Sequence, residues 1–196
     1  MTDLPLLPFL ILALASSAER ELDAAELASQ IKNGDQEAFR NFFERHQESL
    51  FRYLRSRNMD KETAEDLIQQ AFVYIWEHRD GIDPDKSLRS YLFRIAYTRM
   101  LNHIRNNRKF DDSKEQPAGE THQTPEDKTR ARDLEKAIRQ TLKSMPEKRS
   151  RVFELCFLEE FTYREAAEVL DVSVKTIENH MGLAFKDMRK ALQNFL

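Results

Sequence analysis

Five polar side chains crowd into the C-terminal stretch VKTIENH, namely Lys175, Thr176, Glu178, Asn179 and His180. Apolar residues at helical spacing in the same stretch predict a helix whose polar residues point outward. Such side chains suit the edges of DNA bases, because an amide pairs with adenine, a carboxylate accepts from cytosine, and an ammonium meets guanine or a phosphate. The stretch therefore has the chemistry of a recognition helix in the major groove.

The residues before this stretch predict the helix-turn-helix that would position it. Thr162 and Glu165 have the S/T-x-x-E spacing of a capping box, which starts a short helix. Residues 166–170 give that helix a small apolar face, and Ser173 ends a three-residue turn and caps the second helix. An ordinary helical hairpin with a solvated polar face is the alternative. The combination of box, small-residue face, tight turn and polar first turns favours DNA binding.

A second candidate surface lies between Ser87 and Phe110, a stretch without an acidic residue in a chain whose net charge is −3. Basic side chains can follow a phosphate backbone, and interleaved aromatic rings can stack on unpaired bases. The rings could equally belong to the core with the arginines merely solvated, but the unbroken run of positive charge favours single-strand binding. The positive residues are Arg89, Arg94, Arg99, Arg105, Arg108 and Lys109, and the rings are Tyr91, Phe93 and Tyr97.

The chain as a whole predicts an all-α protein of two small helical domains. Its 196 residues contain only 4 glycines and 6 prolines, too few for a turn-dense β fold, and apolar residues recur at helical spacing. We expect one domain over residues 21–108 and a second over residues 128–196. Residues 109–127 are polar and contain proline and glycine, which is typical of a flexible linker.

Residues 1–20 differ from the rest, because Leu4 to Ala15 is a twelve-residue apolar run. A membrane-spanning helix needs about 20 residues. A secretory signal needs a basic residue before the apolar run, but here Asp3 precedes it and the first basic residue is Arg20. We therefore expect an unstructured apolar extension or a start codon assigned too far upstream, on a cytoplasmic protein.

Nothing in the sequence predicts an enzyme. It has no glycine-rich phosphate loop, its five histidines are too dispersed for metal spacing, and its paired acids fall in the expected linker. We expect no catalytic residue, no metal and no cofactor. Cys156, the single cysteine, lies in an apolar run and is predicted to be a buried core residue.

Three segments together resemble the extracytoplasmic-function (ECF) sigma factors of bacterial RNA polymerase, in the sigma-70 family, particularly the branch abundant in Bacteroidetes. The resemblance covers about residues 21–196, in order, and the joint match is far more specific than the helix-turn-helix alone. The segments are AEDLIQQAFVYIWEHR from Ala64, SLRSYLFRIAYTRMLNHIRNNRK from Ser87, and MPEKRSRVFELCFLEEFTYREAAEVLDVSVKTIENH from Met145.

This resemblance implies a subunit that binds core RNA polymerase and directs transcription initiation at promoter DNA. Residues 21–108 would be sigma domain two, which docks on the β′ clamp helices and, with residues 80–87 and the basic helix, melts the −10 element and holds the unpaired strand. Residues 128–196 would be sigma domain four, which meets the β flap and reads the −35 element. A base extruded from the stack must be received by a pocket. A membrane anti-sigma factor is a common partner of such proteins, which are not themselves membrane proteins.

The site residues that the resemblance implies form three sets. Those for polymerase binding are Asp66, Leu67, Gln69, Gln70, Phe72 and Trp76. Those for the −10 strand are Ser87, Arg89, Arg94, Thr98, Arg99, Asn102, Arg105 and Arg108. Those for the −35 element are Ser173, Lys175, Thr176, Glu178, Asn179 and His180.

Some positions depart from the commoner family pattern. Thr98 stands where many members have asparagine, Asn102 where many have aspartate, and Gln70 replaces a frequent acid. Glu178 and Gly182 lie where several relatives carry basic or bulky residues. The resemblance therefore supports the domain roles more firmly than any single base contact.

A response-regulator-type helix-turn-helix regulator, acting without being a polymerase subunit, is the main alternative. Such a protein would need a sensor pocket or a phospho-acceptor domain in its N-terminal half. Residues 21–108 show no βα pattern of that kind.

Overall fold

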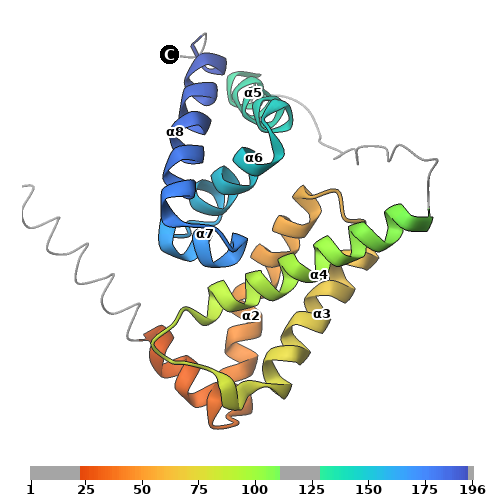
Figure 1. The fold of residues 1–196 in the computed structure, drawn as a ribbon, viewed down its shortest axis with the longest axis vertical. Coiled ribbons are helices and arrows are strands. Elements are labelled where there is room, and N and C mark those ends of the chain that lie inside the picture. The colour runs from red at the N-terminus through yellow and green to blue at the C-terminus, as the bar shows by residue number, and fades with distance from the viewer. Residues whose placement is uncertain (1–22, 111–128, 194–196) are drawn as a thin grey trace, which may run out of the picture.

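Every regular element in the computed structural model, which describes residues 23–110 and 129–193, is a helix or a helical turn (Figure 1). The expected all-α fold is confirmed. The apolar extension and almost all of the expected linker lie outside the described residues. After a first helix over residues 23–32, the elements are α2 (Gln36–Ser56), α3 (Lys61–Glu77), a 3-10 turn (Arg79–Gly81), α4 (Leu88–Phe110), α5 (Thr129–Ser144), α6 (Glu147–Phe153), a π turn (Glu154–Leu158), α7 (Tyr163–Leu170) and α8 (Val174–Ala191).

The helices begin where short polar side chains can satisfy free backbone N–H groups. Asp35 accepts from the amides of residues 37 and 38 before α2, at 2.8 and 3.0 Å. Asp60 accepts from the amide of residue 63 at 2.8 Å before α3, and Ser173 from that of residue 176 at 3.1 Å before α8. Thr162 and Glu165 form the predicted capping box before α7. These four caps fix the starts of α2, α3, α7 and α8.

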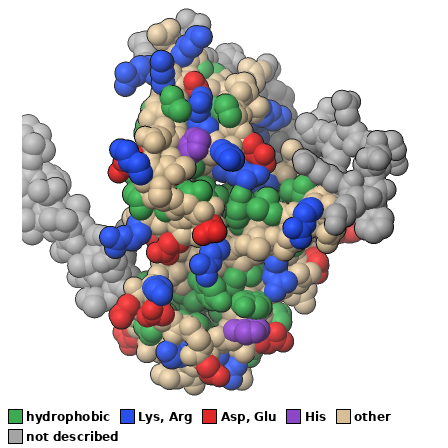
Figure 2. All heavy atoms as spheres, in the orientation of Figure 1, with side chains coloured by type: hydrophobic (Ala, Val, Ile, Leu, Met, Phe, Trp, Pro, Cys, Tyr) green, Lys and Arg blue, Asp and Glu red, His purple; other side chains and the backbone are tan. Residues whose placement is uncertain are grey.

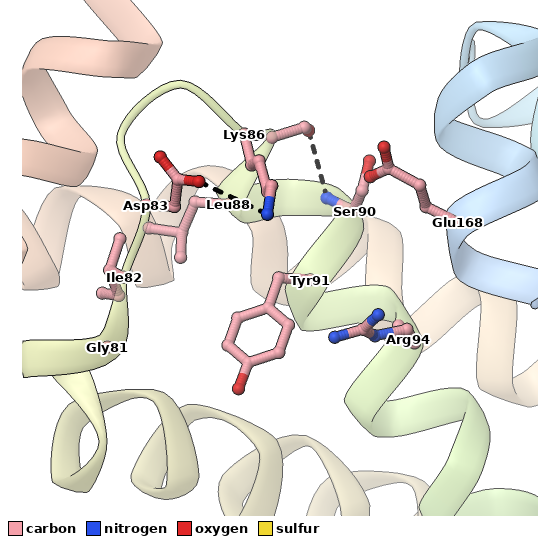
Figure 3. Close-up of a pocket in the computed structure, with 10 residues that line it drawn as sticks. Gly81, Ile82, Asp83, Lys86, Leu88, Ser90, Tyr91, Arg94 and Glu168 are labelled. Carbon is pink, nitrogen blue, oxygen red and sulfur yellow. Dashed lines mark hydrogen bonds and ion pairs between the residues drawn. The ribbon is translucent and has the colours of Figure 1, made fainter.

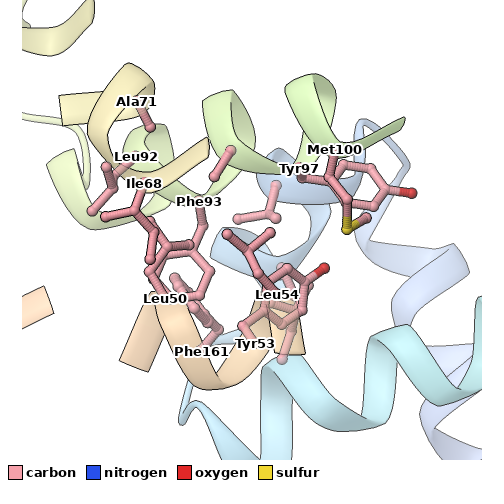
Figure 4. Close-up of a cluster of buried hydrophobic side chains, with 14 of the residues drawn as sticks. Leu50, Tyr53, Leu54, Ile68, Ala71, Leu92, Phe93, Tyr97, Met100 and Phe161 are labelled. Carbon is pink, nitrogen blue, oxygen red and sulfur yellow. The ribbon is translucent and has the colours of Figure 1, made fainter. Parts of the chain in front are cut away.

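The N-terminal bundle, residues 23–110, packs α2, α3 and α4 around an aromatic core. Phe42 and Phe72 meet edge to face with ring centroids 5.8 Å apart. Figure 4 shows how the buried side chains converge from the three helices. The core members it labels from this bundle are Leu50, Tyr53, Leu54, Ile68, Ala71, Leu92, Phe93, Tyr97 and Met100.

The C-terminal bundle, residues 129–193, contains the predicted helix-turn-helix as α7 and α8. Ala166 and Ile177 are fully buried, so the two helices approach closely. Asp171 ends α7 in the left-handed conformation, with φ 53°. The helix expected from Pro146 to Leu158 is instead α6 followed by a π turn, and the extra residue in that turn changes which side chains face inward.

The two bundles pack against each other, with α7 lying across α4 (Figure 1). Phe161, at the start of the helix-turn-helix, is only 3% exposed and meets Phe93 of α4 with ring centroids 4.9 Å apart. Figure 4 shows this ring among the core residues of the N-terminal bundle. The sequence indicated two domains but gave no sign of this contact.

Cys156 is half-buried rather than fully buried, and burial raises the pKa of its thiol to about 11. Within the described ranges, no helix combines the length and the apolar character that crossing a membrane requires.

Candidate nucleic-acid interface

A pocket of about 410 Å³ opens where the loop after the 3-10 turn meets the first turns of α4 (Figure 3). The Lys32 ammonium holds the loop by donating to the Ile82 carbonyl at 2.8 Å. On the rim, Lys86 pairs with Asp83 at 3.3 Å. The loop is the segment expected to hold an unpaired strand, and the pocket has the size of a small-ligand site. Its lining is Gly81, Ile82, Asp83, Lys86, Ser87, Leu88, Ser90, Tyr91, Arg94 and Glu168.

The α4 side of the pocket offers a ring, a cation and a hydroxyl. The half-buried Tyr91 ring has the Arg94 guanidinium 5.2 Å from its centroid. Burial, together with neighbouring Tyr74, raises the pKa of Tyr91, so the phenol stays protonated. The Ser90 hydroxyl is buried and has no hydrogen-bond partner among the described residues. A planar group that stacks on the ring and accepts a hydrogen bond fits this chemistry.

Further along α4, four of the predicted strand-binding residues are exposed or half-buried. Thr98, Asn102 and Arg105 are exposed, and Arg105 donates to the Asn102 side chain at 3.1 Å. Arg99 donates to Gln70 of α3 at 3.1 Å and lies over the Tyr74 ring. These side chains leave an open polar face on α4.

Two further residues of the −10 set, Ser87 in the pocket lining and Arg89 on the first turn of α4, contact the C-terminal bundle. The Ser87 hydroxyl donates to Glu165 of α7 at 2.8 Å, and Arg89 is covered by the C-terminal bundle. The side chain of Arg108 lies outside the described atoms. Of the interleaved aromatics, Phe93 and Tyr97 are core residues, which leaves Tyr91 as the ring available for stacking.

The residues predicted for polymerase binding divide between the surface and the core of the N-terminal bundle. Asp66, Gln69 and Gln70 are exposed, and Gln70 donates to Asp66 at 2.6 Å. Trp76 is half-buried against Phe39. Leu67 and Phe72 are 4% and 3% exposed, so their part in any docking is to shape α3 rather than to touch a partner in this conformation.

The predicted recognition helix presents its polar residues on the first turns of α8. Lys175 pairs with Glu178 at 2.9 Å, and this carboxylate raises the pKa of the ammonium. Asn179 is exposed, whereas His180 is half-buried and its Nδ1 has no partner among the described residues. Ser173 serves as the cap and also shares a hydrogen bond with the Thr176 hydroxyl at 2.9 Å. Lys175, Glu178 and Asn179 are thus exposed members of the predicted −35 set.

Charge on the molecular surface is local rather than global. Figure 2 shows basic side chains gathered at the top, over the C-terminal part of α8, and both signs mixed over the lower bundle.

No group of three histidine, cysteine or acidic side chains in the described ranges could hold a metal ion.

Sequence reasoning missed the acids that face the basic helix from the other bundle. Glu165 was interpreted as a capping residue only, and Glu168, which lines the pocket, was not singled out. It also missed the buried pair between Arg57 of the N-terminal bundle and Glu154 of the C-terminal bundle, 2.6 Å apart. The one available signal was the contrast between an acid-free helix and the acid-rich segment from residue 154 to residue 168.

A pocket beside a basic helix in one bundle and a helix-turn-helix in the other define a two-domain DNA-binding protein of the promoter-recognition class. The chain matches the Sigma-70 region 2 family over residues 42–110 and the Sigma-70, region 4 family over residues 135–188.

Among curated proteins, it is 32% identical to the RNA polymerase sigma factor CnrH of Cupriavidus metallidurans over 168 residues, covering 81% of this chain and 88% of that protein. It is 24% identical to the ECF RNA polymerase sigma factor SigW of Bacillus subtilis, covering 84% of this chain and 94% of SigW. The chain therefore belongs to the ECF branch of the sigma-70 family.

Solved structures agree with the fold. The structure of CnrH in complex with the cytosolic domain of CnrY superposes with a TM-score of 0.61 at 29% identity, covering 87% of this chain and 97% of that one. The sigma factor RpoE of Bartonella quintana, solved in complex with the anti-sigma factor NepR, superposes with a TM-score of 0.62 at 19% identity, covering 79% and 96%. The second likeness concerns the fold alone.

Proposed function

We propose that the protein is the promoter-recognising subunit of a bacterial RNA polymerase holoenzyme and uses its three surfaces at the same time. The exposed part of α3 docks on the β′ clamp helices, and the C-terminal bundle meets the β flap. The pocket and the open face of α4 hold the unpaired −10 strand, and α8 reads the −35 element. Sigma factors initiate transcription and are not enzymes, so catalysis belongs to the polymerase.

The pocket at the start of α4 is the observation that carries this proposal. An extruded base needs a cavity, a stacking surface and a hydrogen-bonding group, and costs a few kcal/mol to unstack. Tyr91, Arg94 and Ser90 bring these features together in the first turns of α4, a helix without acidic residues. A duplex-only regulator has no use for such a pocket.

Transcription with purified core polymerase on a candidate promoter tests the proposal. We expect a promoter-specific transcript only when the protein is present. If the protein binds duplex DNA tightly by itself and gives no such transcript, the response-regulator-type alternative is correct and the sigma proposal is wrong.

Two variants separate strand binding from polymerase binding. Tyr91→Ala removes the half-buried ring that lines the pocket, and base–aromatic stacking contributes about 1–3 kcal/mol per base. We expect open-complex formation to fall by about 5- to 150-fold, with core-polymerase affinity unchanged. Phe51→Ala is the control, because Phe51 is a partly buried ring on α2 that does not line the pocket. Equal losses in both variants would indicate a folding defect instead.

Three further features are proposed on the same basis. The cytosolic domain of CnrY in the CnrH complex supports a membrane anti-sigma factor as the inhibitor of this chain as well. The proposed binding of core polymerase and promoter DNA supports action in the cytoplasm. The three segments starting at Ala64, Ser87 and Met145 support an origin in the Bacteroidetes-like branch. Gene neighbourhood and a pull-down with the adjacent membrane protein test the first and third of these.

A further inference from the structure

Two aromatic side chains at the end of α3 stack on each other outside the core. The ring centroids of His78 and Tyr74 are 4.0 Å apart, with 19° between the ring planes. The Nδ1 of His78 also donates to the Tyr74 carbonyl at 2.9 Å, because a carbonyl can only accept. His78 is exposed and Tyr74 is half-buried. One face of the imidazole is therefore covered by the phenol ring, and the other face is open to solvent.

The stacked pair adjoins the pocket at the start of α4. Tyr74 shares a side-chain hydrogen bond with Tyr91, the ring that lines the pocket. The Arg99 guanidinium lies 5.5 Å from the Tyr74 centroid. The Arg94 guanidinium lies 5.2 Å from the Tyr91 centroid, and Figure 3 shows these two side chains together on α4. Rings and guanidinium groups thus follow one another from His78 on α3 to the pocket.

Packing of the bundle explains the other rings of α3 but not His78. Phe72 and Trp76 pack on rings of α2, at centroid distances of 5.8 and 4.9 Å. Tyr74 meets side chains of α4, so it helps to join two helices. The ring contact and the hydrogen bond of His78 are instead made with Tyr74 of the same helix. An exposed ring that is held in one orientation and does not join helices is suited to a ligand.

Alternating rings and guanidinium groups have the chemistry that an unpaired nucleic-acid strand requires. A base of any identity can stack on an aromatic face, and arginine adds phosphate and cation–π contacts. Because the His78 ring is already held in place by Tyr74, stacking a base on it costs little side-chain entropy. A strand whose extruded base enters the pocket can therefore lay a neighbouring base on this open face.

We propose that the open face of His78, supported by Tyr74, is a second stacking site for the unpaired strand and receives a base close to the one held in the pocket. This inference rests on the function proposed above and extends its strand-binding surface from α4 onto α3. Arg99 contacts the phosphates between the two bases. Because stacking uses the ring face and not the base edge, the site requires a base without selecting which one.

Variants at His78 test the site without disturbing the core, because this side chain is exposed. His78→Ala removes the outer ring, and His78→Phe is the matched control that keeps a flat ring. The probe is a fluorescein-labelled fragment of the candidate promoter, mismatched across the −10 element so that its strands are already unpaired, and it is titrated with holoenzyme. We expect His78→Ala to bind at least about fivefold more weakly than the parent, and His78→Phe to stay within about twofold. Equal affinity of all three proteins, or an equal loss in both variants, would overturn the stacking site.

Abasic nucleotides placed one at a time in the same probe identify the base that each ring holds. With the parent, we expect a loss of affinity at two positions, one for the pocket and one for His78. In His78→Ala the second position should become insensitive, and in Tyr91→Ala the first. Exchanging the base at the second position for another should change the parent's affinity by less than about twofold.

The abasic profile also separates a stacking role from a structural one. If His78→Ala binds more weakly but keeps the profile of the parent, His78 acts only through the fold of α3 and the proposal is wrong. A parent that gives a promoter-specific transcript together with such an unchanged profile contradicts the stacking site alone. A parent that gives no such transcript contradicts the sigma function, and the stacking site with it.

Discussion

Breaking the buried pair between Arg57 and Glu154 should show how strongly the two bundles are coupled. Glu154 accepts from the Arg57 guanidinium at 2.6 Å, from Ser56 at 3.0 Å and from Ser150 at 2.9 Å. The two charged side chains are only 9% exposed. Removing one partner of such a pair leaves an uncompensated buried charge, which costs about 3–5 kcal/mol. Arg57→Met is the informative change, because methionine fills a similar volume without the charge.

The double-mutant cycle with Glu154→Gln sets the magnitude. Each single variant should lose about 3 kcal/mol of unfolding free energy, and the double variant less than the sum, with a coupling energy of about 1–3 kcal/mol. The loss in a single variant is also limited by the free energy of separating the bundles, because separation lets water reach the remaining charge. If each single variant loses well below 3 kcal/mol while the coupling energy remains about 1–3 kcal/mol, the size of the loss measures the free energy of separating the two bundles.

Urea unfolding followed by two signals is the suitable assay. Trp76, the single tryptophan, reports the N-terminal bundle through its fluorescence, and far-ultraviolet circular dichroism reports the helices of both bundles. In the parent protein the two transitions should coincide, and in Arg57→Met they should separate, because the bundles then unfold one after the other. Strictly additive losses, or separate transitions in the parent, would refute the reasoning that the pair joins the bundles.

Three further changes test other parts of the structure. Burial lowers the pKa of the His46 imidazole to about 4, and the charges of Arg89 and Arg45 contribute. In the unfolded chain the same imidazole has a pKa near 6.5. Protons then bind the unfolded state more strongly, and between pH 8 and pH 5 the parent should lose about 2 kcal/mol more stability than His46→Gln. A parallel pH profile for the two proteins would contradict this. The raised pKa of Glu159 changes stability with pH in the opposite direction, but Glu159 is present in both proteins, so its effect cancels in the comparison. Thr162→Ala removes the capping box of α7 and should cost about 1 kcal/mol, or roughly 2–4 °C in Tm, by circular dichroism. Replacing Arg105 and Arg108 by alanine should flatten the salt dependence of holoenzyme binding to an opened promoter by about 1.4 in log–log slope, and an unchanged slope would place both side chains away from the strand.

Local signals made the helices and the helix-turn-helix predictable. Asp35, Asp60, Thr162 and Ser173 each precede a periodic apolar segment, and the hydrogen bonds that make them caps span no more than three residues. The information needed to place them is therefore contained in a short window of sequence. The same holds for the acid-free character of α4, which is contained in one helix and from which the strand-binding face was predicted.

Contacts between distant segments could not be predicted in this way. Leu67 and Phe72 belong to the apolar face of α3, and only the packed bundle shows that neither side chain reaches solvent. Glu154 begins the π turn and is buried, and helical periodicity alone does not predict a buried acid there. Glu154 and Glu165 look like ordinary solvated acids until their partners, about 97 and 78 residues away, are brought beside them.

Because one chain carries both bundles, the contact between them is more stable than its individual bonds would suggest. A segment linked to its target acts at an effective concentration in the millimolar range, even when each contact is weak. Glu165 beside Ser87 and Glu168 in the pocket lining therefore hold two carboxylates next to the acid-free helix α4. A net charge of −3 in a chain with an acid-free helix is consistent with this arrangement, because part of the negative charge faces the helix that it screens.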